Sequence, residues 1–416
     1  ANKVSALKSI NPASLEVNAE IPVTPVEAIG GIIEKAREAQ KNWAKIGLNE
    51  RLKYIKKIRN YLSGNFDDIC TIITKDNGKT LMESAAAEVI PVFDMVNFCV
   101  KEAPDILKKE PLSGTMLKLG RIRAYNVFEP MGVVAIIAPW NFPFAIPFTQ
   151  IIMALTTGNT VILKPAALTA YVGQLIGQIF ERCGFPECVV NVVQGSGSVI
   201  GNALLETGVD KVAFTGSVPV GKYLMQKAGQ TLTPITLELG GKDPFIVLED
   251  ADIDRAASGA VWGSFVNAGQ VCASVERVYV HKKVASQFIA LVEAKTKKLR
   301  VGNGLDFGTD MGPLIDEGQL ESVEAHVNGA LAKGARVLAG GHRIDSFPGH
   351  FFEPTVLVDV DHTMECMTEE TFGPTMPVMV VSSDDEAIEL ANDSRFALTA
   401  SVWTKDVSRA EALCRR

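Results

Sequence analysis

Apolar positions recur with a helical period over the first quarter of the chain. Between about Val26 and Leu107 they are spaced three and four residues apart, with breaks, which predicts a series of amphipathic helices. Thr24, Pro25 and Glu27 stand at the start of this region. They form a capping-box pattern with proline in the first turn, so we expect the first helix to begin there.

The pattern changes near residue 110. The segment PLSGTMLKLGRIRAYNVFEP (111–130) alternates between apolar and polar residues and predicts a hairpin of two strands. Short β-branched runs follow from Gly132 and alternate with helical stretches: VVAIIA, TVILK, VVNVV, KVAFT and ITLEL. A second series begins near Asp250: RVYVH, ARVLAG, TVLVDV, TMPVMVV and TASVWT. Such alternation is the signature of βαβ units and predicts an α/β fold with parallel sheets.

The longest apolar run, MGVVAIIAPWNFPFAIPFTQIIMALTTG, is long enough to cross a membrane. However, Pro139, Pro143 and Pro147 interrupt it, and Asn141 lies between them. These helix breakers would leave backbone groups without hydrogen bonds in a bilayer. We therefore expect no membrane association, and we expect this run to fold inside the protein with an irregular centre.

Length and charge narrow the class of protein. A chain of 416 residues is expected to form two or three domains. The net charge is -7, and the basic residues are scattered apart from one cluster at residues 53–59, which we expect on a solvated helix face. Nucleic acid is therefore not an expected partner. The seven cysteines are odd in number and widely spaced, which indicates a reducing compartment and a cytoplasmic location.

Two glycine-rich loops come close to nucleotide-binding motifs. GSVPVGKY (Gly216–Tyr223) resembles a phosphate-binding P-loop, but Tyr223 stands where that loop needs Ser or Thr to hold magnesium. The loop still follows a strand and opens a helix, so its amides could hold an anion. GSGSVIG (Gly195–Gly201) departs from the dinucleotide fingerprint because its last glycine comes one residue late. An ordinary tight turn is the alternative for both loops.

Metal chemistry is not expected. The five histidines include no pair three or four residues apart, and Cys183 and Cys188 lack a second cysteine pair. We expect those two thiols to lie in the core or on the surface.

Cys272 occurs in the small, uncharged run FVNAGQVCASVERVYV, directly before a predicted strand. Taken alone, a lone cysteine here is more often a buried structural thiol. A thiol nucleophile needs a base, oriented dipoles or a helix terminus, because a free thiol is mostly protonated at neutral pH. The nearest histidine, His281, lies in the following strand.

Three other positions favour a catalytic role for Cys272. Asn141 lies in APWNFPF, where flanking prolines make the loop rigid and its amide a suitable donor to an oxyanion. Taken alone, an asparagine here is more often a turn residue. Glu238, in TLELGGKDP, is a candidate general base, with a solvent-facing carboxylate as the alternative. Lys164 ends the strand in VILKPAAL, at the sheet edge where cofactors bind.

Together, APWNFP, LKPA, FTGSVPVG, LELGGKDP, NAGQVCA and EETFGP (Glu369–Pro374) resemble the aldehyde dehydrogenase superfamily in order and spacing. The resemblance runs from about Ile10 to the end of the chain, and Cys272 follows Glu238 by 34 residues. It implies a modified Rossmann dinucleotide-binding domain (1–110 and 131–240) and an α/β catalytic domain (241–416). A small β oligomerisation element (111–130) completes the implied architecture.

The resemblance also implies a hydrolytic mechanism and its residues. Cys272 would attack the aldehyde, Asn141 and the Cys272 amide would hold the oxyanion, and Glu238 would activate the water that hydrolyses the thioester. The cofactor-binding residues implied by the family are Trp140, Lys164, Gly216, Ser217, Leu239, Glu370 and Phe372.

The cofactor is expected to be NAD or NADP, without a metal. NAD-preferring members often carry a glutamate three residues after the lysine, where this chain has Ala167, so the expectation is NAD, slightly preferred, or both.

The expected substrate is an aliphatic or aromatic aldehyde, because no cation follows the WNFP segment locally. A succinate semialdehyde-type substrate is the alternative, with Arg277 or a distant cation binding its carboxylate. Two other readings stay open: a CoA-acylating enzyme, against which Glu238 argues, and a non-catalytic structural or binding protein on the same fold.

Family members usually continue past the equivalent of EALCRR with a strand, a glycine-rich segment and a tail that pairs with a neighbouring subunit. A homodimer or homotetramer is therefore expected where that segment is present.

Overall fold

The computed structural model describes residues 6–416, which divide into two compact units. Unit 1 comprises the residues up to Ser9, Asn18–Ile73 and Ser84–Glu238. Unit 2 comprises Ile10–Val17, Thr74–Glu83 and Leu239–Arg416. The sequence placed segments 10–17 and 74–83 in the first domain, whereas both pack within unit 2. There, for example, the Leu81 N–H donates to the Gly304 carbonyl at 3.0 Å. A hydrophobic period predicts a helix, but it does not predict which of the two units that helix packs in.

The N-terminal region is helical, as the pattern predicted. It contains η1 (Val26–Ala28), α1 (Ile29–Lys45), α2 (Gly47–Gly64), α3 (Phe66–Asn77), α4 (Leu81–Glu83), the π-helical turn η2 (Ser84–Val89) and α5 (Ile90–Ile106). The expected capping box does not form. The Thr24 hydroxyl instead accepts the Gln194 N–H at 2.9 Å, and the first turn is a 3-10 turn without a side-chain cap. The basic cluster lies exposed on α2, as expected.

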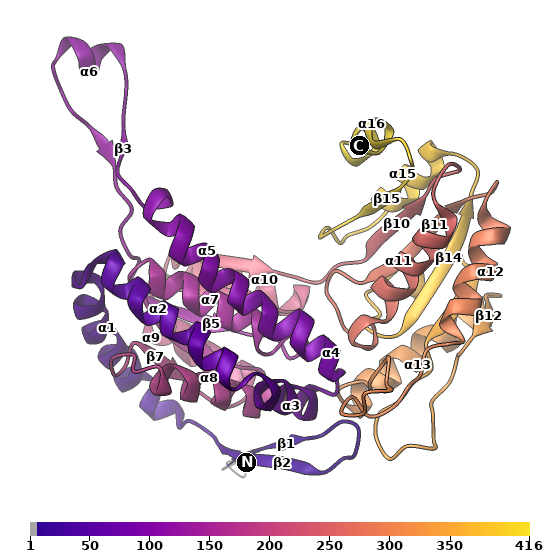
Figure 1. Cartoon of the computed structure of the whole chain (residues 1–416), viewed down its shortest axis with the longest axis horizontal. Helices are drawn as coiled ribbons and strands as arrows, with labels where there is room; N and C mark the ends of the chain where they lie inside the picture. Colours follow the sequence, from indigo (N-terminus) through magenta and orange to yellow (C-terminus); the bar gives the residue numbers. More distant parts are fainter. Residues whose placement is uncertain (1–5) are drawn as a thin grey trace. The chain divides into compact units, whose positions relative to one another are not determined.

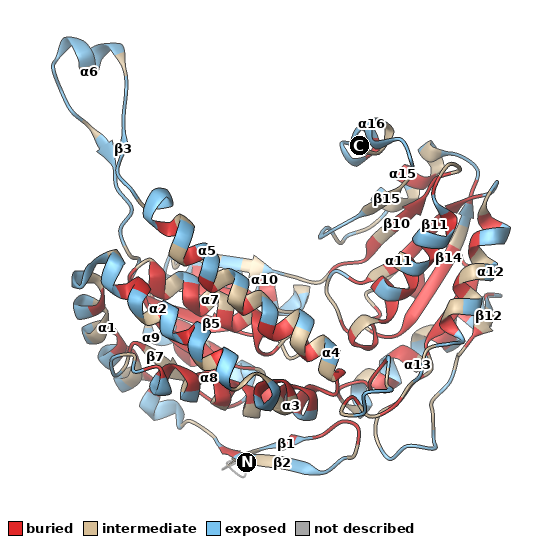
Figure 2. Ribbon diagram, in the orientation of Figure 1, coloured by how far each residue is buried: buried red, intermediate tan, exposed pale blue. Residues whose placement is uncertain are grey.

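A five-stranded parallel sheet forms the centre of unit 1 (Figure 1). Its strands are β5 (Val133–Ile137), β6 (Thr160–Lys164), β7 (Val190–Val192), β8 (Lys211–Thr215) and β9 (Ile235–Glu238). The connecting helices are α7 (Ala145–Thr156), η3 (Ala167–Thr169), α8 (Ala170–Arg182), α9 (Gly197–Thr207) and α10 (Val218–Gly229). Every residue of β5 and β6 is buried (Figure 2), which explains their unbroken apolar runs.

The strand order of this sheet, β7-β6-β5-β8-β9, is that of a doubly wound fold. The chain builds outward from β5 in one direction and then continues from β8 in the other. Ligands of such folds bind outside the carboxyl ends of the strands at this switch point.

The expected hairpin at 111–130 is present in a shortened form. β3 (Glu110–Pro111) pairs antiparallel with β4 (Tyr125–Asn126), and the helix α6 (Thr115–Leu119) occupies the tip. The two strands of the expected hairpin are therefore present, with two residues each, and the rest of the segment forms the helical tip and loops. The hairpin projects from unit 1 and is largely exposed (Figure 2).

Unit 2 contains a six-stranded sheet of order β12-β13-β14-β11-β10-β15, parallel except between β12 and β13. The strands are β10 (Asp243–Val247), β11 (Val275–His281), β12 (Arg336–Ala339), β13 (Thr355–Val358), β14 (Thr375–Val381) and β15 (Ser401–Trp403). The helices are α11 (Ile253–Phe265), η4 (Val266–Gly269), α12 (Ala285–Thr296), α13 (Glu317–Ala332), α14 (Glu365–Thr368), α15 (Asp384–Asn392) and α16 (Val407–Cys414). The short strands β1 (Ala6–Ile10) and β2 (Val17–Pro22) pair separately.

The long apolar run around Pro139 folds as β5, an irregular loop and α7, as expected. Within residues 6–416, no helix combines the length and the apolar character needed to span a membrane.

Candidate active site

The candidate residues of unit 1 lie at one edge of its sheet. Because the strands are parallel, their carboxyl ends share this edge. The half-buried Trp140 and the buried Asn141 follow β5, and Lys164 is the last residue of β6. Gly216 and Ser217 follow β8, and Glu238 is the last residue of β9. The structure therefore brings together these six residues, which come from four strands.

The loop that carries Asn141 is held where it enters α7. Asn141 itself is only 3% exposed. The loop leads into α7, whose first amides are bound by Glu88: this carboxylate accepts the N–H of Phe144 at 3.1 Å and of Ala145 at 2.7 Å. Glu88 is fully buried in η2, and it supplies the negative charge that a helix N-terminus favours. The sequence analysis missed Glu88, because a contact spanning 57 residues leaves no local pattern.

Lys164 is a buried cation. It is 3% exposed, and burial lowers the pKa of its ammonium from the ordinary 10.5 to about 8. Among residues 6–416, none accepts a hydrogen bond from it or forms an ion pair with it. A Cβ built on Gly197, the first residue of α9, would lie 3.8 Å from the Lys164 Nζ. A helix N-terminus carries partial positive charge, so the two positive groups together fit an anionic or hydroxyl-rich ligand.

The loop after β8 is tied to the end of β9. The Gly216 N–H donates to the Glu238 carbonyl at 3.0 Å, and Ser217 precedes α10 at its N-cap. Within residues 6–416, no side chain caps α10. Its first amides are therefore available to a phosphate, as the sequence suggested for this loop.

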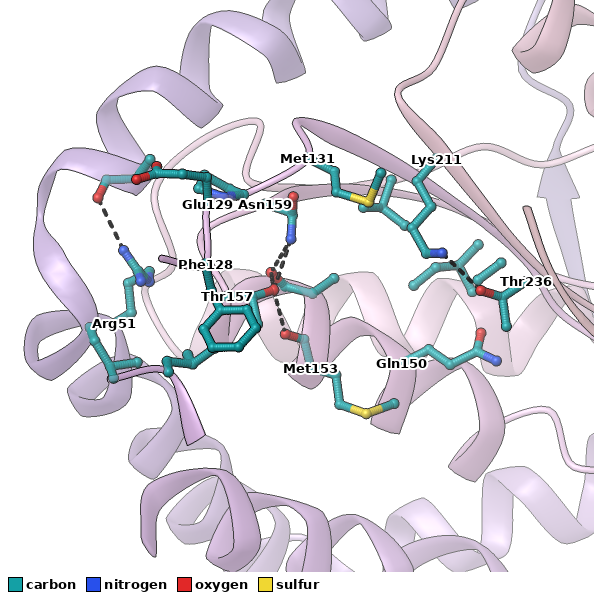
Figure 3. A pocket seen from close by; sticks show the side chains of 18 of the residues that line it. Arg51, Phe128, Glu129, Met131, Gln150, Met153, Thr157, Asn159, Lys211 and Thr236 are labelled. Atoms are coloured by element: carbon teal, nitrogen blue, oxygen red, sulfur yellow. Dashed lines mark hydrogen bonds between the residues drawn. The ribbon is translucent and has the colours of Figure 1, made fainter. Parts of the chain in front are cut away.

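Glu238 is exposed and lines a cavity of about 710 Å³ within unit 1 (Figure 3). The cavity lies against the sheet face that carries Ile136, Ala213 and Glu238, beside α7. Its other walls are mostly apolar, among them Leu48, Leu107, Phe128, Met131 and Met153. Lys211 also lines it and donates to the Thr236 hydroxyl at 2.8 Å (Figure 3).

The candidate residues of unit 2 also gather at one strand edge, but at the amino ends. The half-buried Leu239 lies before β10, Cys272 before β11, and Glu370 and Phe372 before β14. These three parallel strands are neighbours in the sheet. Sequence reasoning pointed only to carboxyl ends and did not foresee this second edge.

The loop before Cys272 is rigidly held. Asn267 and Ala268 both have a positive φ, of 52° and 54°. The Asn267 N–H donates to the Glu83 carboxylate at 2.6 Å. Gly269 also has a positive φ, of 72°, and a Cβ there would overlap the Gly373 carbonyl. Glycine is therefore required where this loop crosses the segment that follows Glu370.

The Cys272 thiol is half-buried and not in a disulfide. Burial raises its pKa, the Ala273 N–H lowers it, and the negative charges of Glu370 and Asp243 raise it further. The thiol form therefore predominates at neutral pH, and nucleophilic attack requires a base.

Glu370 lies against the backbone of Gly240 and Gly241. Its carboxylate accepts the Gly241 N–H at 3.2 Å, and a Cβ on Gly240 would overlap it. Burial, followed by the charge of Glu276, raises the pKa of Glu370 to about 7. A Cβ on Gly241 would in turn lie 2.5 Å from the Cys272 carbonyl oxygen. The two glycines thus allow Glu370 and the Cys272 loop to approach the same short backbone segment.

Arg277, considered above as a carboxylate ligand, is not available for that role. It is 1% exposed, and its guanidinium donates to the carbonyls of Lys242, Leu390 and Ala391 at 2.7 to 3.1 Å. Its donors hold β10 and the end of α15 to β11. Within residues 6–416, no three His, Cys, Asp or Glu side chains group as metal ligands would.

Comparison with known proteins agrees with this architecture. The model of the "Aldehyde dehydrogenase family" matches residues 1–416. A "4,4'-diapolycopene aldehyde oxidase" of Methylomonas sp is 38% identical over 410 residues, covering 99% of this chain and 76% of that protein. A Mycobacterium ulcerans relative, whose name refers to succinate-semialdehyde dehydrogenase and NADP+, is 37% identical over 396 residues, or 95% of this chain and 76% of its own length.

Solved structures share the fold closely. The aldehyde dehydrogenase from Brucella melitensis biovar abortus 2308 has a TM-score of 0.95 and 36% identity, with 100% of this chain and 84% of that one covered. An NAD+ complex of an aldehyde dehydrogenase from Bacillus cereus has a TM-score of 0.92 and 33% identity, with 99% and 83% covered. The chain therefore belongs to the aldehyde dehydrogenase family.

Proposed function

We propose that this protein oxidises an apolar aldehyde to a carboxylic acid with NAD(P)+, and that Cys272 is its nucleophile. The observation that carries the proposal is the Cys272 loop itself. A half-buried thiol follows a loop fixed by Glu83 and Gly269, and it shares the amino edge of β10, β11 and β14 with Glu370. A purely structural thiol would need neither the strained loop nor the neighbouring carboxylate.

In the proposed reaction, the Cys272 sulfur bonds to the aldehyde carbon as its thiol proton leaves to a base. The carbonyl oxygen takes the negative charge, which the Asn141 side chain and the Cys272 N–H stabilise. Bound NAD(P)+ supplies a hydride acceptor, so that the carbon becomes a thioester carbonyl. Glu238 then takes a proton from water, the water oxygen bonds to that carbon, and the carbon–sulfur bond breaks to release the acid and Cys272. A carboxylate suited to activating water also argues against CoA as the acceptor.

The residues that would hold the cofactor suit a dinucleotide. The unpartnered ammonium of Lys164 and the uncapped N-terminus of α10 fit hydroxyl and phosphate groups. Gly216 and Ser217 would receive the pyrophosphate, and Glu370 would bind the nicotinamide ribose. Trp140, Leu239 and Phe372 would shape the remainder of the site.

Both NAD+ and NADP+ are proposed as cofactors. A slight preference for NAD was predicted from the sequence, but the charge at Lys164 supports acceptance of a 2'-phosphate as well. Ala167 presents no carboxylate that would repel it. Relatives of known structure include one described with NAD+ and one, a 3,6-anhydro-L-galactose dehydrogenase, described with NAP.

The cavity beside Glu238 supports an apolar aldehyde as the substrate. Its walls are largely apolar, and the Methylomonas relative is named for 4,4'-diapolycopene aldehyde. A semialdehyde is a second candidate because Lys211 is a cation in the same cavity. The Lys211 ammonium donates to the Thr236 hydroxyl at 2.8 Å, and Thr236 lies two residues before Glu238 on β9, about 7 Å along the strand.

Self-association through the hairpin is also proposed. Its apolar side chains are exposed, including Met116 at 77%, Leu119 at 75% and Ile122 at 60%. Contiguous exposed apolar surface of this kind marks an interaction site. A second copy of the chain, forming a homodimer or homotetramer, is the proposed partner. A cytoplasmic location stays a prediction.

The test replaces Cys272 with alanine and measures reduced cofactor by its absorbance across a panel of aldehydes, with NAD+ and NADP+ separately. The expected result is loss of aldehyde oxidation with dinucleotide binding retained. Turnover in the Cys272→Ala variant would remove the nucleophile assignment. Absence of turnover in the unaltered protein with every aldehyde would favour the non-catalytic alternative.

A further inference from the structure

The segment Glu370–Phe372 has a backbone conformation that its surroundings must impose. Phe372 has a φ of 53°, in the left-handed region that non-glycine residues rarely adopt. Such a residue costs on the order of 1 kcal/mol or more and persists only where neighbouring contacts hold it. The contacts around Thr371 and Phe372 identify what holds it.

One carboxylate binds both amides of this turn. Glu276, on β11 and only 3% exposed, accepts the N–H of Thr371 at 2.8 Å and of Phe372 at 2.9 Å, one on each oxygen. Lys242, 1% exposed, lies 2.6 Å from the same carboxylate and also donates to the Thr371 hydroxyl at 3.3 Å. The charge of Glu276 is therefore balanced in the core, and its oxygens are used by main-chain donors.

The carbonyls of the same two residues are bound from another element. Gln319, in the first turn of α13, donates through its side-chain nitrogen to the Thr371 carbonyl at 3.1 Å and to the Phe372 carbonyl at 3.0 Å. His326, also on α13, lies 3.0 Å from the Thr371 hydroxyl. The main chain of both residues is thus held through its N–H groups and through its C=O groups.

A buried ion pair does not by itself stabilise a protein, because apolar residues of similar size can often replace it without loss of stability. An apolar pair at 242 and 276 would, however, leave the Thr371 and Phe372 amides unsatisfied in the core. Each unsatisfied buried donor is unfavourable. The turn therefore needs the carboxylate at 276 as the acceptor for its two amides, and the lysine at 242 balances the charge of that carboxylate.

We propose that Glu276, Lys242 and Gln319 form a loop clamp, a set of positioning residues that fixes Glu370 and Phe372 for the nicotinamide half of the cofactor. This inference rests on the proposed function, because it takes from that function the role of Glu370 and Phe372. The clamp contacts neither substrate nor cofactor and acts through the turn alone. Loosening it should weaken the dinucleotide and leave ligands that lack the nicotinamide half unaffected.

The experiment measures calorimetric binding of NADP+ and of 5'-ADP to the full chain and to its Glu276→Gln variant. Glutamine keeps the volume but offers one acceptor oxygen for two N–H groups. The dissociation constant for NADP+ is expected to rise about ten- to a hundredfold, the effect of losing one charge-assisted hydrogen bond, and that for 5'-ADP to change less than about twofold. Glu249→Gln, which breaks the exposed pair with Lys283, is the matched control and should change neither constant.

If Glu276→Gln raises the dissociation constants of NADP+ and 5'-ADP equally, or raises neither, the loop-clamp proposal is wrong. If Glu276→Gln does not fold, Gln319→Ala decides by the same criterion, because Gln319 is only half-buried and its loss removes two neutral hydrogen bonds. Failure of the proposed function has a different signature: the unaltered protein would then not bind NADP+ or NAD+ at all.

Discussion

Replacing Lys164 with methionine is expected to stabilise the cofactor-free protein while weakening its binding of NADP+. Burial lowers the pKa of the ammonium from 10.5 to about 8. Folding therefore disfavours the charged form, and at pH 7 this difference of roughly 2.5 units corresponds to about 3 kcal/mol of lost stability. Methionine fills similar space without the charge, so the variant should regain up to that amount.

The pH dependence of the free energy of unfolding tests the same reasoning independently. Between pH 8 and 10.5 the unfolded chain binds more protons at Lys164 than the folded protein does. The free energy of unfolding contributed by this site therefore rises with pH through that window and is lowest below it. In the Lys164→Met variant this contribution is absent, so its advantage over the unaltered protein should shrink between pH 8 and 10.5.

Urea unfolding followed by tryptophan fluorescence at pH 7, 8, 9 and 10 measures this difference, and calorimetry with NADP+ measures the loss of binding. Lys222→Met, at an exposed position on α10, is the control and should change stability by less than about 0.5 kcal/mol. A Lys164→Met variant that is less stable at pH 7, or whose difference from the unaltered protein does not vary with pH, would refute the reasoning.

Three further predictions concern carboxylates. Glu238→Gln should give a burst of reduced cofactor in stopped-flow absorbance and then stall, because the thioester is not hydrolysed; steady turnover would exclude Glu238 as the base. Glu370→Gln removes a negative charge that raises the pKa of Cys272, so iodoacetamide should alkylate this thiol several-fold faster at pH 8, where Glu370 is otherwise ionised. Glu369→Gln, which alters the half-buried neighbour, is the control. An unchanged alkylation rate in Glu370→Gln would contradict the electrostatic coupling. Glu88→Gln should lower the free energy of unfolding by about 1.5–3 kcal/mol, measured by urea unfolding, because Glu88 holds the end of the Asn141 loop. It should also reduce kcat, measured by initial rates, because Asn141 is then less firmly placed. Unaltered values for both would show that Glu88 does not hold the loop.

Strand positions were predictable where burial leaves an apolar run. All five strands of the unit 1 sheet coincide with runs read from the sequence. In β5 and β6 every residue is buried, so their β-branched residues give an unbroken signal. The strand β10 was missed. It begins with Asp243 and Pro244, at an irregularity in its pairing with β11, and this dipeptide is typical of a turn.

Contacts between distant residues were not predictable. Thr24 looked like a helix cap, yet its hydroxyl binds Gln194, 170 residues away. Glu88, Glu276 and Gln319 hold the loops of the candidate site through contacts that span 52 to 96 residues. The resemblance to a family located the residues expected to react, whereas the side chains that position them became visible only with the fold.

The crossing of Gly269 with Gly373 has a consequence for anyone who wishes to redesign the enzyme. The two loops meet through bare backbone, so neither can change its path unless the other moves with it. Mutant libraries that diversify the cysteine loop alone should therefore yield mostly inactive clones. Libraries that vary both segments jointly have a route to new specificities.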